Sequence, residues 1–163
     1  MPTGARNRAT KRAPASDTGW TAGFVVDCSV SVAWLFDEQA DAYTEAALDA
    51  IAQQPALAPA WWPVEMLNVL LMLERRGRLS ASDAVEALRQ TQRLPVHTRP
   101  TTSSPFELHA LASSYRLTSY DTLYLDLALT TGAPLATRDK ALAQAAVGCG
   151  VGVWQPDGPS SLP

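Results

Sequence analysis

The chain has 163 residues, 47% of them hydrophobic and 18% charged, with a formal net charge of -3. This length supports one domain with a sizeable core and is too short for two comfortable domains. No apolar run approaches the roughly 20 residues that span a bilayer, and the N-terminus lacks the apolar core of a secretory signal, so we expect a soluble, cytoplasmic protein with no membrane segment.

Charge divides the chain into a basic tail and an acidic body. Residues 1–22 carry a net charge of +3 without hydrophobic periodicity, so we expect them to be disordered. The remainder carries -6, and we expect one folded domain over 23–156 with a flexible end at 157–163. Cys28 and Cys149 lack metal-ligand spacing and are expected to be small buried hydrophobes. An acidic body suits a polyanionic partner only if cations neutralise some of its carboxylates.

Short apolar runs alternate with segments of helical periodicity along the body of the chain. In chain order the pattern predicts a strand at 24–26, helices at 29–36 and 39–53, a strand at 57–60, helices at 63–76 and 80–94, a strand at 95–99, helices at 106–116 and 119–132, a strand at 134–137, a helix at 139–147 and a strand at 151–154. This alternation predicts a three-layer α/β/α sandwich around a mainly parallel sheet.

Four acidic residues fall where such a sheet brings side chains together. Asp27 ends the first strand, and Asp139 follows Thr137 at the end of a later strand. Glu65 and Asp121 lie in the first turns of their helices. Because the crevice of an open parallel sheet lies beyond the carboxyl ends of its strands, we expect the four carboxylates to face one crevice.

Each of these acids also has an ordinary interpretation. Asp121 and Asp139 can stabilise helix N-termini, Asp27 can be an N-cap, and Glu65 can be solvated. The apolar neighbours of Glu65 and Asp121 weigh against this, since a buried lone carboxylate must be paired or neutralised. With no His or Cys ligands, a hard cation such as Mg²⁺ or Mn²⁺ is the natural partner.

Four segments together resemble a known family. They are VVDCSVSVAWL from Val25, EMLNVL from Glu65, SYDTLYLDLA from Ser119 and LATRDKAL from Leu135. In this order, over about residues 24–154, they resemble the PIN-domain ribonucleases, and within them the VapC-type toxins of bacterial toxin–antitoxin modules. The resemblance implies a PIN-like fold and a metal-dependent endoribonuclease that hydrolyses RNA phosphodiester bonds.

The resemblance also implies roles for individual residues. The acids Asp27, Glu65, Asp121 and Asp139 would bind one or two Mg²⁺ or Mn²⁺ ions and position the attacking water. Ser29 and Thr137 would support the site by hydrogen bonding, Asn68 would orient Glu65, and Arg138 and Lys140 are candidates for contacts with RNA phosphates. For Ser29 a helix N-cap role is equally open.

A small VapB-like antitoxin and a homodimer are the protein partners that the resemblance implies. The antitoxin would pack along apolar surface near Trp34, Trp61 and Trp62. The last two could instead stack on RNA bases, although core and interface packing is more usual. Asp126 lies roughly 140° around its helix from Asp121, so we expect surface exposure or a dimer contact rather than a fifth ligand.

Two other functions remain open. A PIN fold without activity would only bind a partner, but the presence of all four acids disfavours it. A phosphotransfer domain with Asp27 as nucleophile, as in haloacid dehalogenase-like phosphatases, would carry a second Asp where this chain has Ser29.

Overall fold

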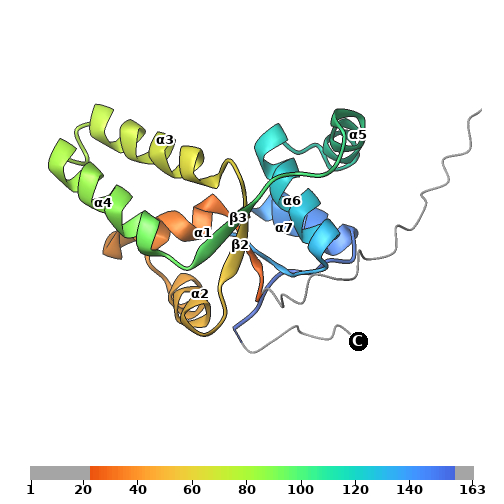
Figure 1. Cartoon of the computed structure of the whole chain (residues 1–163), viewed down its shortest axis with the longest axis horizontal. Helices are drawn as coiled ribbons and strands as arrows, with labels where there is room; N and C mark the ends of the chain where they lie inside the picture. Colours follow the sequence, from red (N-terminus) through yellow and green to blue (C-terminus); the bar gives the residue numbers. More distant parts are fainter. Residues whose placement is uncertain (1–22, 157–163) are drawn as a thin grey trace, which may run out of the picture.

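A parallel sheet runs through the middle of the computed structural model, which describes residues 23–156 (Figure 1). Its strands are β1 (Val25–Val26), β2 (Ala56–Pro59), β3 (Val96–Arg99) and β4 (Leu135–Ala136), in the order β3-β2-β1-β4. All of the strand pairs are parallel. The carboxyl ends of the four strands therefore meet at one edge of the sheet, as the sequence pattern predicted.

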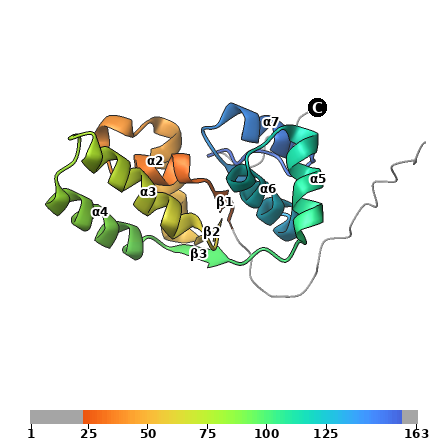
Figure 2. The ribbon, with the colours of Figure 1, turned by 90° about the horizontal axis from the view of Figure 1, so that it is seen from above.

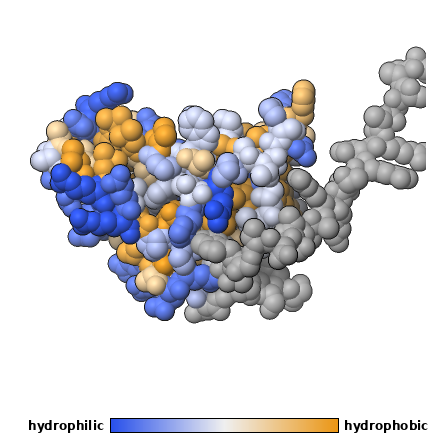
Figure 3. Space-filling view, in the orientation of Figure 1, coloured by the Kyte–Doolittle hydropathy of each residue, from blue (hydrophilic) through white to orange (hydrophobic). Residues whose placement is uncertain are grey.

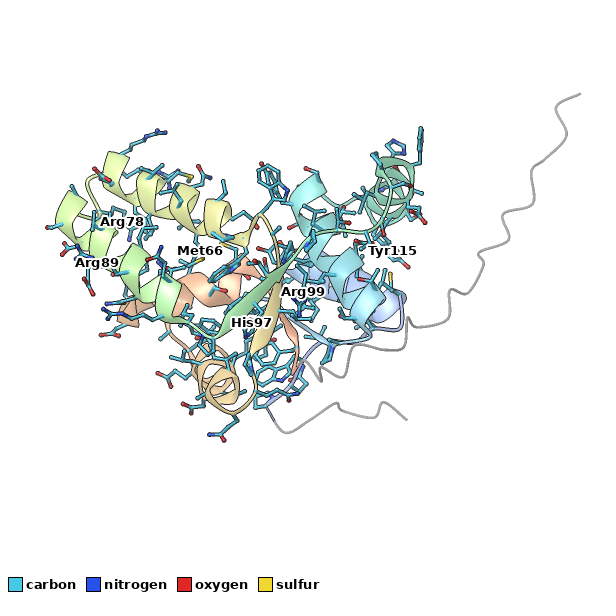
Figure 4. All side chains as sticks on the ribbon, in the orientation of Figure 1. Met66, Arg78, Arg89, His97, Arg99 and Tyr115 are labelled. Atoms are coloured by element: carbon cyan, nitrogen blue, oxygen red, sulfur yellow. The ribbon has the colours of Figure 1, made fainter. Side chains whose placement is uncertain are left out.

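The sheet is apolar at its centre and polar at one edge. β1 and β4 are buried on both faces, which explains why both consist of small or branched apolar residues. At the β3 edge, His97, Thr98 and Arg99 are exposed, and Figure 4 shows His97 and Arg99 on this strand. Polar and charged side chains on an edge strand discourage pairing with other chains.

Helices cover both faces of the sheet, as Figure 2 shows from above. One group comprises α1 (Cys28–Ala33), the 3-10 turn η1 (Asp37–Gln39), α2 (Ala42–Gln53), α3 (Trp62–Arg75) and α4 (Ala81–Arg93). The other comprises α5 (Pro105–Tyr115), α6 (Ser119–Thr131) and α7 (Lys140–Gly148), and α6 packs on β1, β2 and β4. The predicted three-layer α/β/α sandwich is confirmed. Among the helices of residues 23–156, none has the length and apolar character of a membrane span.

Some predicted elements have different bounds in the structure, and local interactions explain the differences. The helix expected at 29–36 ends at Ala33, and the next begins at Ala42 because the Asp41 side chain caps it by accepting from the Thr44 backbone N–H (2.8 Å). The strand expected at 151–154 is reduced to one bridge between Val153 and Leu135. Positive φ angles at Gly150 and Gly152 (75° and 84°) interrupt extended backbone there.

The expectation that Asp126 is exposed was wrong. Its side chain is buried, 7% exposed, because α6 packs on the sheet and residues of the loop that follows β3 contact the carboxylate. The Ser103 hydroxyl donates to Asp126 Oδ1 (2.6 Å) and the Thr101 hydroxyl donates to Oδ2 (2.8 Å). Asp126 therefore anchors the loop between β3 and α5, away from the predicted crevice.

The two cysteines differ in their burial. Cys28 is buried as expected, whereas Cys149 is only half-buried. The expectations for residues 1–22 and 157–163 concern parts of the chain outside the described residues.

Candidate active site

Asp27 is the most tightly held of the predicted acids. It follows β1 at the N-cap of α1, but its side chain makes no capping hydrogen bond. Instead its Oδ2 accepts from the Ser29 hydroxyl (2.6 Å) and from the Thr137 hydroxyl (2.8 Å). The side chain is 6% exposed, so the carboxylate has a fixed direction inside the protein.

The two hydroxyls also hold the turn between β4 and α7. Ser29 Oγ accepts from the Arg138 backbone N–H (3.1 Å), and Thr137 Oγ1 accepts from the Asp139 backbone N–H (3.0 Å). Each hydroxyl thus donates to Asp27 and accepts from the turn. Ser29 lies inside α1 and serves this network rather than the N-cap that was its alternative role.

Glu65 is half-buried in the first turn of α3 and takes its partner from α6. The Tyr124 hydroxyl, on a side chain only 1% exposed, donates to Glu65 Oε2. The expected partner Asn68 makes no hydrogen bond with Glu65; its amide donates to Met72 Sδ (3.9 Å) on the exposed side of α3. The sequence held one signal that could have pointed to Tyr124. If a tyrosine is buried, its hydroxyl normally has a hydrogen-bond partner.

Asp121 combines a helix-end role with proximity to the other acids. Thr118 caps α6: its Oγ1 accepts from the Asp121 backbone N–H (3.2 Å) and donates to Asp121 Oδ2 (2.6 Å). The charge of Asp121 nevertheless raises the pKa of Asp27 and of Glu65. The helix-end interpretation of Asp121 is therefore confirmed, and its role as a metal ligand stays a prediction.

Asp27, Glu65 and Asp121 form a cluster in which burial and repulsion raise the pKa of Asp27 and Glu65. Burial is the largest cause that raises the pKa of Asp27, followed by opposing hydrogen bonds from Ser29 and Thr137. Burial also raises the pKa of Glu65, against the hydrogen bond from Tyr124, and Asp27 and Asp121 add to the rise. Within residues 23–156, none of the three acids forms an ion pair with Arg, Lys or His.

The structure places Asp139 at the margin of the cluster. Its Oδ1 accepts from the Leu142 backbone N–H (2.8 Å) and caps α7. It is exposed, and it is not among the charges that shift the pKa of Asp27 or Glu65. Its backbone, however, is tied to Asp27 through Thr137, so the turn brings Asp139 to the same edge of the sheet.

Neighbouring side chains define a cleft of about 800 Å³ beside the acids. Its lining includes Glu65 and Asn68 of α3, Ser29 of α1, Tyr120 of α6 and Arg138. Cys28 also lines it, but burial and the charges of Glu65 and Asp27 raise the pKa of its thiol, which disfavours the nucleophilic thiolate.

The adjacent tryptophans occupy different environments. Trp62 is 4% exposed, and its Nε1 donates to Ser31 Oγ (3.0 Å) inside the core. Trp61 is 57% exposed, while Trp34 is half-buried with its Nε1 donating to the Thr44 carbonyl (2.7 Å). Of the three tryptophans that were expected to border the apolar surface for the antitoxin, Trp61 is therefore the one that is exposed.

The donor atoms of the cluster suit a hard divalent cation. Each of the three acids uses one carboxylate oxygen to accept from a hydroxyl, and a carboxylate has further lone pairs for a cation. In the part of the chain described, no group of three or more His, Cys, Asp or Glu side chains is arranged closely enough to hold a metal ion. The three acids fit Mg²⁺ or Mn²⁺ in donor type alone, and a bound ion would offset negative charge that pairs with no cationic side chain of residues 23–156.

Comparison with known proteins assigns the family. The family model of the PIN domain matches residues 24–148. The chain belongs to the PIN-domain family.

Two curated relatives and one solved structure add detail to that assignment. Ribonuclease VapC3 of Mycobacterium tuberculosis, from strains CDC 1551 / Oshkosh and ATCC 25618 / H37Rv, is 33% identical over 95 residues, which cover 58% of this chain and 68% of the relative. The crystal structure of PAE2754 from Pyrobaculum aerophilum aligns with a TM-score of 0.59 and 22% identity, over 76% of this chain and 79% of that one. The structural likeness supports the PIN fold.

Replacing Asp27 by Asn tests whether the buried charge of Asp27 destabilises the folded protein. The Asn oxygen can still accept from Ser29 and Thr137, so we expect the variant to fold. Folding raises the pKa of Asp27. The stability that the protonated carboxyl group contributes is therefore fully present below the pKa of the unfolded state, and it is lost as pH rises through the pKa of the folded state. In EDTA, urea unfolding should therefore show Asp27→Asn more stable than the wild type at neutral pH, by a margin that shrinks as pH falls.

The exposed acid Asp49 on α2 supplies the control for this measurement. Asp49→Asn removes a charge that is exposed to solvent and should not show this gain in stability at neutral pH. A wild type as stable as Asp27→Asn at neutral pH in EDTA would show that the buried charge is compensated within the protein.

Proposed function

We propose that this protein is a divalent-metal-dependent endoribonuclease and the toxin of a toxin–antitoxin pair, with residues 23–156 as its PIN domain. The observation that carries the proposal is the cluster of Asp27, Glu65 and Asp121, which share one electrostatic environment without a cationic side-chain partner among the described residues. Similarity to a relative named a ribonuclease supports RNA as the substrate, and an RNA substrate is consistent with a cytoplasmic location.

Each residue of the site has a distinct part in the proposed reaction. Asp27, Glu65 and Asp121 would hold Mg²⁺ or Mn²⁺, and Asp139 would contribute from the turn before α7. The bound ion would supply an activated water and stabilise negative charge at the phosphorus. Ser29 and Thr137 orient Asp27. Tyr124 orients Glu65, the role expected of Asn68.

The apolar face of α3 is the surface that we propose for the antitoxin. Val64, Leu67, Leu71 and Met72 are exposed along this helix, and Val85 of α4 is exposed nearby in the helical hairpin. Figure 3 shows hydrophobic residues gathered at the upper left, over α3. An antitoxin segment seated there would lie next to the cleft, since Val64 also lines it. A homodimer would use the same kind of exposed apolar surface.

The arrangement also bears on the rival functions. Oδ2 of Asp27 is held by two hydroxyl groups, so a phosphotransfer mechanism would depend on Oδ1 as the nucleophile, and Ser29 stands where haloacid dehalogenase-like phosphatases carry a second Asp. An inactive PIN fold that only binds a partner would have no use for a cluster of acids in which the pKa of Asp27 and Glu65 is raised. The ribonuclease proposal accounts for both features.

A matched pair of first-turn acids tests the proposed activity. Asp83 in α4 exchanges the same two hydrogen bonds with Ser80 that Asp121 exchanges with Thr118, but it lies outside the acidic cluster. Cleavage of total RNA should require Mg²⁺ or Mn²⁺ and stop in EDTA. Asp121→Asn should lose more than the roughly 10–100-fold that removal of an outer hydrogen-bonding partner costs, while Asp83→Asn should keep wild-type activity.

Two outcomes would contradict the proposal. Metal-independent cleavage would remove the role of the acids. Equal activity of Asp121→Asn and Asp83→Asn would reduce Asp121 to a helix-end residue.

Tyr124→Phe tests how Glu65 is positioned. Loss of the hydroxyl removes the hydrogen bond to Glu65 Oε2 while the ring still fills the core, so we expect about a 10–100-fold fall in kcat. Tyr115→Phe is the control, because Tyr115 lies on α5, to the right in Figure 4, and does not line the cleft. If both variants cleave RNA at the wild-type rate, Tyr124 does not position Glu65 for the reaction.

A further inference from the structure

We propose that the cleft beside the acids is a subsite for one unpaired nucleotide of the substrate, in which Arg138 binds a phosphate and Tyr120 stacks on the base. This inference rests on the proposed ribonuclease function and extends it to the recognition of the RNA strand. It brings together two side chains that line the same cleft from different elements.

Arg138 is held in place at the cleft although it is exposed. Its Nη1 donates to the Gln39 carbonyl (3.0 Å), and its Nη2 lies 3.5 Å from Asp41 Oδ2. Its backbone N–H donates to Ser29 Oγ, which connects it to Asp27. A guanidinium has five N–H donors, so these contacts fix its direction and leave donors for a phosphate.

Asp41 is itself fixed and makes a suitable anchor for Arg138. It is the N-cap of α2, where its Oδ1 accepts from the Thr44 backbone N–H (2.8 Å). The Thr44 hydroxyl oxygen accepts in return from the Asp41 backbone N–H (2.9 Å). Asp41 is therefore a positioning residue for Arg138, while the phosphate would contact Arg138 alone.

Tyr120 supplies the aromatic surface of the subsite. It is 54% exposed, directly precedes Asp121 and lines the cleft together with Glu65. Val32, Val64 and Val69 also line the cleft. An exposed ring and a fixed cation in one groove are the combination by which proteins bind single-stranded nucleic acid.

The geometry favours an unpaired nucleotide over a duplex. The cleft volume of about 800 Å³ lies within the roughly 300–1,000 Å³ typical of ligand pockets. A base can stack on Tyr120 only after it leaves its neighbours in the strand, which duplex pairing prevents. Among the lining residues of the described chain, Arg138 is the only cation, so one phosphate is the expected charge partner.

The first test compares two arginines in cleavage of a single-stranded RNA oligonucleotide. Arg89 on α4, at the left of Figure 4, is exposed and forms one ion pair with Glu86 (3.3 Å), so Arg89→Gln removes the same charge away from the cleft. Arg138→Gln should raise KM about tenfold with a smaller change in kcat, and Arg89→Gln should not. Anisotropy of labelled RNA on an Asp121→Asn background should show the salt slope of log Kd reduced by about 0.7 for Arg138→Gln.

Asp41→Asn separates positioning from direct contact. Asn is as good an N-cap as Asp, so α2 keeps its cap while Arg138 loses its ion pair. KM should rise by less than in Arg138→Gln. In the double variant, Asp41→Asn should add no further rise, because its effect acts through Arg138. A fully additive rise would overturn this role for Asp41.

Tyr120→Leu tests stacking, with Phe106→Leu as its control. Phe106 is 87% exposed on α5 and does not line the cleft. Tyr120→Leu should weaken binding of single-stranded RNA about fivefold or more, and Tyr120→Phe should recover most of this loss. Binding of a fully paired duplex should not depend on the ring.

The outcomes separate this inference from the proposed function. A wild type that cleaves no RNA with Mg²⁺ or Mn²⁺ would overturn the ribonuclease proposal. A wild type that cleaves RNA, with equal KM in Arg138→Gln and Arg89→Gln, would overturn only the subsite. A Tyr120→Leu variant that changes oligomeric mass in solution without changing RNA binding would assign the ring to a protein interface and overturn its stacking role.

Discussion

The arrangement of the acidic site depends on a single shared acceptor, Asp27 Oδ2. It accepts the hydroxyls of Ser29 and Thr137, and these hydroxyls accept backbone N–H groups of the turn before α7. The bonds join positions 109 and 110 residues apart in the chain. Since β1 and β4 are each two residues long, their ladder alone is short, and the side-chain network extends their alignment to the edge where the site forms.

The same cluster shows how helix-end chemistry and a functional site coexist. Asp121 takes part in the cap of α6 and Asp139 is the N-cap of α7, so both stabilise the fold as acids at helix N-termini do. Yet burial and neighbouring charge raise the pKa of Asp27 and Glu65, which the fold alone does not require. Groups whose ionisation is disfavoured in this way are typical of functional sites.

Much of the fold was predictable because the signals are local. Alternating apolar runs and caps such as Asp41 define elements within a few residues, and the family segments pointed to Ser29 and Thr137 beside Asp27. Partners across elements were not predictable. Helical periodicity gave the angle of Asp126 but not the loop that covers it. The family resemblance pointed to Asn68 as the partner of Glu65, and Tyr124 was missed because only the packed structure brings α6 against Glu65.

The central claim is that the three acids hold a divalent cation, and anomalous scattering from crystals grown with Mn²⁺ tests it most directly. The account predicts one or two Mn²⁺ peaks within roughly 2.0–2.4 Å of oxygens of Asp27, Glu65 and Asp121, and loss of these peaks in Asp27→Asn crystals. Mn²⁺ bound only at surface carboxylates such as Glu38 or Asp49, with the cluster unchanged, would contradict it.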